Sequence, residues 1–410
     1  MIKKTCRFCG AELQHVFCDL GASPPSNSYL REDQLDASEA FFPLLALVCD
    51  HCFLVQLPQF QDPSEIFSDY AYFSSYSESW LRHAKDYADY MMSRFKYDNS
   101  SRVVEVASND GYLLTNFRDR NVPVLGIEPA ANVAAVAEGK GIPTRVCFFG
   151  EETAKALVAE GVQADLLVGN NVLAHVPDLN DFVRGLKILL KPDGVLTMEF
   201  PHLLRLIEQN QFDTIYHEHF SYFSFTTVEK VFARHGITLF DVQELPTHGG
   251  SIRIFGRHSD RRGTVTAAVT QMRSAEEAAG LNRLETYVAF GSKAQKAKRS
   301  LLTFLIGARD AGKTVVGYGA PAKGNTLLNY CGVRNDMIEY TVDISPHKQG
   351  MFLPGTRIPI FAPERIKQTR PDYVLILPWN LKAEIARQLS FVRDWGGRLV
   401  IPIPQTEVVS

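Results

Sequence analysis

The chain has 410 residues, and its 46 acidic and 43 basic side chains leave a net charge of −3. This balance provides no net cationic field, so we expect no nucleic-acid partner. No apolar run reaches the roughly 18–20 residues that cross a bilayer. We therefore expect no membrane segment, and we see no secretory signal. Seven cysteines in a chain of this length favour a reducing compartment, the cytoplasm.

Two cysteine pairs stand near the start of the chain, each with two residues between its thiols. Each pair supplies two thiolates from one tight turn, which is half of a tetrahedral Zn²⁺ shell. The pairs lie farther apart than the usual zinc-ribbon spacing, so the intervening strands must bring them together. His51 could compete as a ligand, and two unrelated buried pairs are the alternative. We predict one structural Zn²⁺ held by Cys6, Cys9, Cys49 and Cys52.

Short apolar runs then alternate with helical stretches in two series, which is typical of βαβ units around parallel sheets. We expect one long helix over 274–310 to join the two series. The length and this pattern predict an α/β protein with three units, 1–62, 63–268 and 269–410. The expected strands are 102–107, 122–128, 165–169 and 194–200 in the first series, and 314–318, 338–342, 373–377 and 398–401 in the second.

The turn after the first of these strands, residues 105–111, opens a helix and suits a ligand that approaches the backbone. It is not G-x-G-x-x-G, because Ala107 and Asn109 replace glycines. Glu128 ends the next strand, where an acid can accept hydrogen bonds from a ribose. A methyltransferase cofactor and a nicotinamide both remain open at this point. The candidate cofactor residues are Ala107, Ser108, Asn109, Asp110, Gly111, Glu128, Pro129, Phe148 and Asn170.

Residues 216–222, Tyr-His-Glu-His-Phe-Ser-Tyr, place two imidazoles, a carboxylate and two phenols together. Histidine is the side chain best suited to move a proton near neutral pH. The segment could be a strand or a turn, and a metal site or a structural role is the alternative. His175 follows the fourth strand and could contact substrate. Other candidate substrate residues outside the second series are Tyr70, Tyr72, Tyr222, His248, Ser251 and Arg253.

The second series begins with a loop that contains G-x-x-x-x-G, from Gly319 to Gly324. Lys323 precedes the second glycine instead of following it, so the loop is not a Walker A motif. Backbone N–H groups could still hold a diphosphate, with Lys323 as counter-charge. A purely structural turn is the alternative. The candidate nucleotide residues are Gly319, Ala320, Pro321, Lys323, Asn325 and Asp343.

The order of these motifs resembles the sugar C-methyltransferases, which methylate C3 of a nucleotide-linked 4-keto-6-deoxy sugar. The resemblance covers nearly the whole chain, and residues 216–219 and 319–324 are its specific parts. It implies an N-terminal zinc-binding region, a central class I methyltransferase domain for S-adenosylmethionine and a C-terminal Rossmann-like domain for the nucleotide sugar. It further implies one structural Zn²⁺. We expect dTDP as the nucleotide, although the sequence leaves UDP, GDP and CDP open. We expect a monomer.

By the same resemblance His219 is the base, and Tyr216, Glu218, His175 and Tyr70 surround the sugar. Ala107 stands where many relatives have glycine. We interpret Tyr216 or His175 as the donor to an enolate oxygen and Glu218 as the group that orients a neighbour. The alternatives are a methyltransferase acting on another acceptor, a nicotinamide-dependent nucleotide-sugar epimerase or dehydrogenase, and a non-catalytic zinc scaffold.

Overall fold

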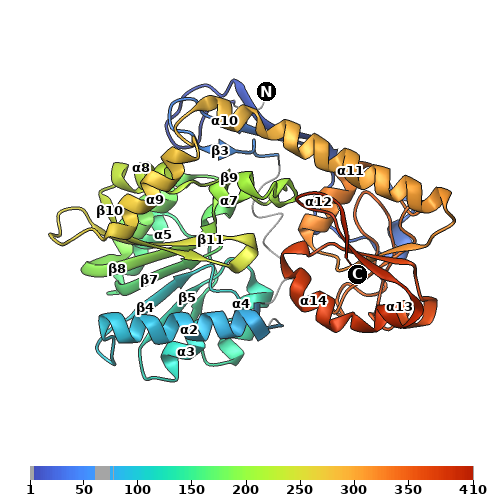
Figure 1. The fold of residues 1–410 in the computed structure, drawn as a ribbon. Coiled ribbons are helices and arrows are strands. Elements are labelled where there is room, and N and C mark those ends of the chain that lie inside the picture. Colours follow the sequence, from blue (N-terminus) through green and yellow to red (C-terminus); the bar gives the residue numbers. More distant parts are fainter. Residues whose placement is uncertain (1–3, 61–73, 77, 410) are drawn as a thin grey trace.

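The computed structural model describes residues 4–60, 74–76 and 78–409, which form three sheets with helices around them (Figure 1). The predicted α/β class is confirmed, with a small N-terminal sheet beside two larger α/β units. Within the described part of the chain, no helix is both long and apolar enough to cross a membrane. The N-terminal sheet has the order β1-β2-β3-β9, built from β1 (His15–Ser23), β2 (Phe42–Val48), β3 (Val55–Gln56) and β9 (Ser221–Tyr222).

The N-terminal sheet packs against both larger units, because strand β2 is apolar on both faces. Side chains alternate across a strand, and the buried residues of β2 divide accordingly. Leu44, Ala46 and Val48 pack into a core shared with the C-terminal unit, whereas Leu47 packs into the core of the central unit. One short strand thus contacts both units.

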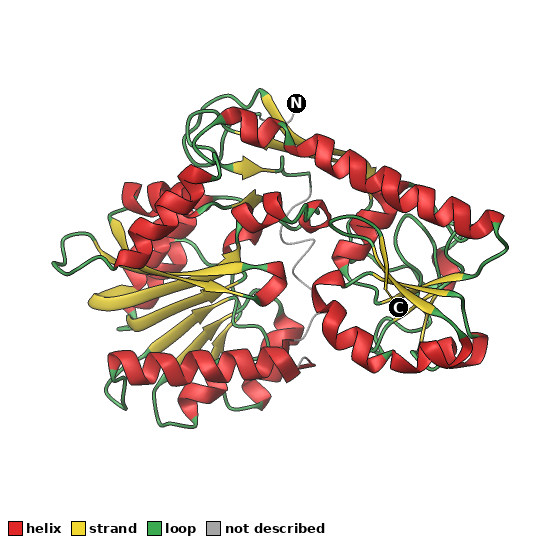
Figure 2. Ribbon diagram, viewed as in Figure 1, coloured by secondary structure: helices red, strands yellow, loops and turns green. Residues whose placement is uncertain are grey.

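The central unit is a seven-stranded sheet of order β10-β11-β8-β7-β4-β5-β6, parallel from β8 to β6 and antiparallel at β10 and β11. Helices cover both of its faces (Figure 2). Its strands are β4 (Val103–Val106), β5 (Val124–Ile127), β6 (Thr144–Arg145), β7 (Ala164–Asn170), β8 (Leu190–Pro201), β10 (Ile237–Leu245) and β11 (Ser251–His258). Its helices are α2 (Glu78–Phe95), α3 (Leu114–Arg118), α4 (Ala131–Gly139), α5 (Glu151–Ala159), α6 (Leu179–Leu189), α7 (Leu203–Glu208) and α8 (Phe225–Arg234).

The prediction of a single helix over 274–310 is wrong, because the chain between the two larger units forms three helices. They are α9 (Ala267–Ala278), α10 (Leu284–Val288) and α11 (Phe290–Asp310). Gly280 has a φ of +82°, a backbone conformation that ends an α-helix. Phe290 at the start of α11 stacks on Phe17 of β1, with ring centroids 4.5 Å apart. From there α11 runs to the C-terminal unit (Figure 1).

The C-terminal unit is a six-stranded sheet of order β14-β13-β12-β15-β16-β17, parallel except at β17. The strands expected in this unit are present, the one at 338–342 in a shortened form. The strands are β12 (Val315–Tyr318), β13 (Thr341–Val342), β14 (Ile360–Phe361), β15 (Tyr373–Ile376), β16 (Arg398–Ile401) and β17 (Glu407–Val409). The helices are α12 (Ala322–Cys331), α13 (Arg365–Thr369) and α14 (Lys382–Gln388).

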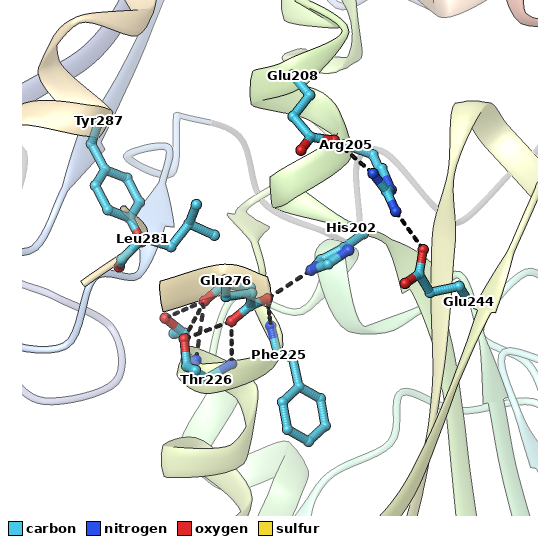
Figure 3. A network of polar contacts seen from close by, with 11 residues as sticks. His202, Arg205, Glu208, Phe225, Thr226, Glu244, Glu276, Leu281 and Tyr287 are labelled. Carbon is cyan, nitrogen blue, oxygen red and sulfur yellow. Dashed lines mark hydrogen bonds and ion pairs between the residues drawn. The ribbon is translucent and has the colours of Figure 1, made fainter. Parts of the chain in front are cut away.

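A fully buried carboxylate, Glu276 of α9, fastens the start of α8 (Figure 3). The first backbone N–H groups of a helix have no partner within the helix. Glu276 accepts the N–H of Phe225 at 2.5 Å and that of Thr226 at 2.9 Å. His202, directly before α7, donates from Nε2 to the same carboxylate at 2.7 Å. Glu276 therefore joins three helices of the central unit.

We predict that Glu276→Ala lowers the free energy of unfolding by about 3–5 kcal/mol, because it leaves a buried imidazole N–H and two backbone donors without an acceptor. The measurement is denaturant or thermal unfolding followed by circular dichroism. Glu277→Ala changes the exposed neighbour on the same helix and serves as the control. Equal stability of the two variants would show that the buried network contributes little.

Candidate functional site

The four paired cysteines come together at one end of the N-terminal sheet. Cys6 and Cys9 precede β1, Cys49 and Cys52 follow β2, and the antiparallel register sets the two pairs side by side. The Sγ atoms of Cys6 and Cys52 are 3.5 Å apart, as are those of Cys9 and Cys49. All four sulfurs lie within 4.8 Å of one another. This is a four-thiolate arrangement that fits tetrahedral Zn²⁺ with no open position. His51 is exposed and is not part of this group.

The loop after β4 has the backbone expected of a cofactor loop. Ala107, Asn109 and Gly111 have φ values of +56°, +48° and +74°. Left-handed backbone costs a non-glycine residue roughly 1–2 kcal/mol, and such strain concentrates at binding sites. Ala107 therefore occupies a position that favours glycine. Lys140 holds the loop by donating from Nζ to Asp110 at 2.9 Å.

Two polar side chains follow the adjacent parallel strands at the same edge of the sheet. Glu128, after β5, accepts the backbone N–H of Asn109 at 2.9 Å and that of Ala130 at 3.0 Å. Burial raises the pKa of Glu128, although these two hydrogen bonds oppose the rise. Asn170 ends β7, and neither its Oδ1 nor its Nδ2 has a hydrogen-bond partner among the described residues. A buried amide without partners indicates a ligand at this edge.

The histidine-rich segment forms a turn, in which the N–H of His219 donates to the carbonyl of Tyr216 at 2.9 Å. Nδ1 of His219 lies 2.9 Å from the carbonyl oxygen of Thr214. A carbonyl only accepts, so Nδ1 carries the proton and the Nε2 lone pair can take one. The ring of His175 lies edge-on to that of His219 at a centroid distance of 4.7 Å, and the ring of Tyr216 is tilted by 33° at a centroid distance of 4.0 Å. Burial, followed by the nearby His175, holds the pKa of His219 well below its usual range.

The other members of the segment have separate surroundings. Glu218 is buried and accepts from Nδ2 of Asn27 at 2.7 Å. Burial raises the pKa of Glu218 to about 7, and the Asn27 donor limits the rise. His217 turns the other way, with Nε2 3.2 Å from the carbonyl oxygen of Pro43. The two imidazoles of the segment therefore do not share a ligand position, and among the described residues only the cysteine quartet is arranged to hold a metal.

A loop of the N-terminal region connects this segment to the C-terminal unit. Asn27, which contacts Glu218, stands next to Ser26, whose carbonyl accepts from Nδ2 of Asn325 at 2.6 Å. Tyr29 Oη donates to the carbonyl of Ala320 at 2.5 Å. The histidine-rich segment and the loop before α12 thus meet through one short stretch of chain.

The loop before α12 is braced from within the C-terminal unit. Gly319 has a φ of +87°, and the N–H of Ala320 donates to Asp343 Oδ2 at 2.7 Å. Asp343 Oδ1 accepts the N–H of Ser345 at 2.8 Å. Asp343 was predicted to bind a ribose, but both of its carboxylate oxygens accept hydrogen bonds from backbone N–H groups. Lys323 points out of this unit, and its Nζ donates to the carbonyl of His248 at 3.2 Å. Pro321 directly precedes α12.

His248 belongs to a polar network at the ends of β7 and β8. It has a φ of +55°, and its Nε2 accepts from Nδ2 of Asn171 at 3.2 Å, while burial lowers the pKa of His248 to about 4. Nearby, Glu199 at the end of β8 binds Nε2 of His83 and Nη2 of Arg253, each at 2.9 Å. Arg253 is therefore engaged by an internal ion pair.

Of the remaining predicted residues, Tyr222 lies at the site: it is buried in β9, and its ring centroid is 6.1 Å from that of His219. The others are dispersed, since Phe148 is 47% exposed and Ser251 Oγ donates to the carbonyl of Thr247 at 3.0 Å. Tyr70 and Tyr72 lie outside the described residues. Sequence reasoning missed Asn27 and Thr214, which touch Glu218 and His219. Neither has a motif around it, because each acts through one long-range or backbone contact.

Family models match three parts of the chain: a zinc-binding domain over residues 6–67, a methyltransferase domain over 79–242 and a C-methyltransferase C-terminal domain over 246–404. With the Rossmann-like fold and the cofactor loop, these matches define an S-adenosylmethionine-dependent methyltransferase. Magnesium protoporphyrin IX methyltransferase from Synechocystis PCC 6803 has 12% sequence identity and a TM-score of 0.34, over 44% of this chain and 79% of that chain.

C-methyltransferase NovU from Streptomyces niveus is 36% identical over 405 residues, which are 99% of this chain and 96% of that protein. The chain belongs to this family of C-methyltransferases. A ubiquinone biosynthesis O-methyltransferase from Bartonella tribocorum is 26% identical over 106 residues, 26% of this chain and 42% of that protein. The acid after β5, the left-handed loop and the unpartnered Asn170 fit S-adenosylmethionine, and the cysteine quartet fits Zn²⁺.

We predict one Zn²⁺ per chain in the purified protein, measured by plasma emission spectroscopy. Cys52→Ala removes one of four ligands and should reduce the metal content to a small fraction. Cys147→Ala, at a half-buried cysteine far from the quartet in sequence, should retain it. A full complement of zinc in the Cys52 variant would contradict a four-cysteine site.

We predict that Asn27→Ala moves the acidic limb of the pH–rate profile of methyl transfer to higher pH. Loss of the Asn27 donor removes a contact that favours ionised Glu218, so the pKa of Glu218 rises above about 7. Activity that needs the ionised carboxylate then falls at neutral pH and recovers in alkali. Ser28→Ala, at the exposed neighbour, is the control. An unchanged profile for Asn27→Ala would show that the ionisation of Glu218 does not limit turnover.

Proposed function

We propose that the chain transfers a methyl group to C3 of a nucleotide-linked 4-keto-6-deoxy sugar, with dTDP the expected nucleotide and His219 as the base. The observation that carries this proposal is the state of His219, a buried neutral imidazole with Nδ1 committed to the Thr214 carbonyl. A carbon acceptor has to lose a proton before it can be methylated. An imidazole with a free Nε2 can take that proton.

The surroundings of His219 suit an acceptor carbon next to a ketone. Removal of the C3 proton moves negative charge onto the C4 oxygen, so the site needs a donor as well as a base. His175 and Tyr216 lie against the base and can supply such a donor. Burial lowers the pKa of His175 to about 4, so its imidazole is neutral at physiological pH and carries one N–H. Glu218 lies on the same turn and orients the sugar or a neighbouring side chain.

The second α/β unit supports a nucleotide-linked acceptor. Its first loop, braced by Asp343 and Tyr29, begins a helix whose residues reach the central unit. We assign cofactor binding to residues 63–268 and nucleotide binding to residues 269–410. The backbone of residues 319–321 then faces the diphosphate. S-adenosylmethionine supplies the electrophilic methyl group when it is bound.

We predict that His219→Asn lowers turnover with a dTDP-linked 4-keto-6-deoxy sugar by at least about 10²–10³-fold, because general base catalysis is lost. Affinity for S-adenosylhomocysteine, measured by calorimetry, should change little. His217→Asn is the matched control, since that imidazole lies on the same turn but faces Pro43. Near-normal turnover of the His219 variant would remove this residue from the role of base.

A further inference from the structure

Lys323 lies in the first turn of α12, but its side chain does not serve the loop that precedes it. The ammonium donates to the carbonyl oxygen of His248 at 3.2 Å and lies 5.4 Å from the ring centroid of Trp379. His248 lies between β10 and β11 of the seven-stranded sheet, so this cation reaches from the C-terminal unit to the central unit. The sequence alone indicated that Lys323 is a counter-charge for a diphosphate at the loop. The contacts show that its ammonium points toward the central unit instead.

The ammonium lacks a full set of acceptors. Among the described residues, the His248 carbonyl is the one acceptor within hydrogen-bond distance of Nζ. Asp213 is the nearby acid, but it makes no direct ion pair with Lys323: its Oδ2 accepts from Nε1 of Trp379 at 2.6 Å, and its Oδ1 has no hydrogen-bond partner among the described residues. An ammonium has three donors and is costly to remove from water without an anionic partner. Lys323 is therefore prepared for an anion that arrives with the substrate or forms during the reaction.

The position of Lys323 relative to the base decides between these two anions. Trp379, whose ring the ammonium approaches, donates to Asp213, and Asp213 directly precedes Thr214, whose carbonyl binds Nδ1 of His219. Nε2 of His248 in turn accepts from Asn171, the residue directly after β7 at the edge of the sheet where the cofactor is expected. The cation thus lies beside the place where the acceptor carbon meets the base. A diphosphate bound at residues 319–321 would lie on the loop side of α12 instead.

We propose that Lys323 is a catalytic residue that donates a hydrogen bond to the C4 oxygen of the sugar while the C3 proton leaves; this rests on the proposed function. In this step the C3–H bond breaks, and Nε2 of His219 receives the proton. The electron pair of that bond forms the C3=C4 double bond, and the carbonyl π pair moves to the C4 oxygen as an enolate. The Lys323 ammonium stabilises that oxygen, and no oxidant or further reactant is required.

The test compares Lys323→Met with Lys323→Arg. We expect Lys323→Met to lower kcat by roughly 10²–10³-fold, which is the usual loss of one oxyanion donor. The exchange of the C3 hydrogen with solvent deuterium, followed by NMR in the presence of S-adenosylhomocysteine, should fall in parallel. Lys323→Arg should recover part of both rates, because it keeps the charge. Lys382→Met, at an exposed lysine of α14, is the control.

Calorimetric titration of S-adenosylhomocysteine and dTDP completes the experiment. Both affinities should be nearly unchanged in Lys323→Met, which also shows that the variant is folded. Weakened dTDP binding with normal exchange at saturating sugar would overturn the inference and return Lys323 to the diphosphate. Absence of methylated product from the unmodified protein would overturn the proposed acceptor itself, and it would be recognised before any lysine variant is measured.

Discussion

The antiparallel pairing of β9 with β3 is the constraint on which the site depends. Val55 pairs with Tyr222 and Gln56 with Ser221, and the N–H of Leu57 donates to the carbonyl of Phe220. These bonds attach β9, which begins two residues after His219, to the N-terminal sheet. The turn that carries Glu218 and His219 is thereby held where the three units meet. The histidine-rich segment thus covers a sheet edge that would otherwise be open.

This junction also determines the charge state of the site. Imidazoles and carboxylates shift toward their neutral forms when they are removed from water. The pKa values of His175, His219 and His248 are lowered and that of Glu218 is raised for this reason. Residues of all three units contribute to this burial, since Asn27 contacts Glu218 and Lys323 contacts His248. The neutral state of His219, which the proposed role as base requires, thus depends on the domain arrangement as well as on the local sequence.

The local parts of this structure could be predicted from the sequence, because each depends on a short pattern. Two cysteine pairs indicated the thiolate quartet, and the apolar runs indicated the parallel strands. The ends of helices were harder to predict. The left-handed Gly280 follows the end of α9 inside the span expected to be one helix, although the composition of 274–310 favours helix throughout. The direction of each side chain in the histidine-rich turn depends on a hydrogen bond to Thr214 or Pro43, and no pattern in the sequence encodes those contacts.

Residues that contact another unit were the hardest to predict from the sequence. Asn27 is separated from Glu218 by most of the methyltransferase sequence, and Asp343 supports backbone instead of standing free at its strand end.

The central claim is that two ligands bind to two units of one chain. Calorimetric titration of S-adenosylhomocysteine, followed by dTDP and UDP into the binary complex, tests it most directly. The account predicts binding of S-adenosylhomocysteine and of one nucleotide, and binding of S-adenosylhomocysteine with neither nucleotide would contradict it.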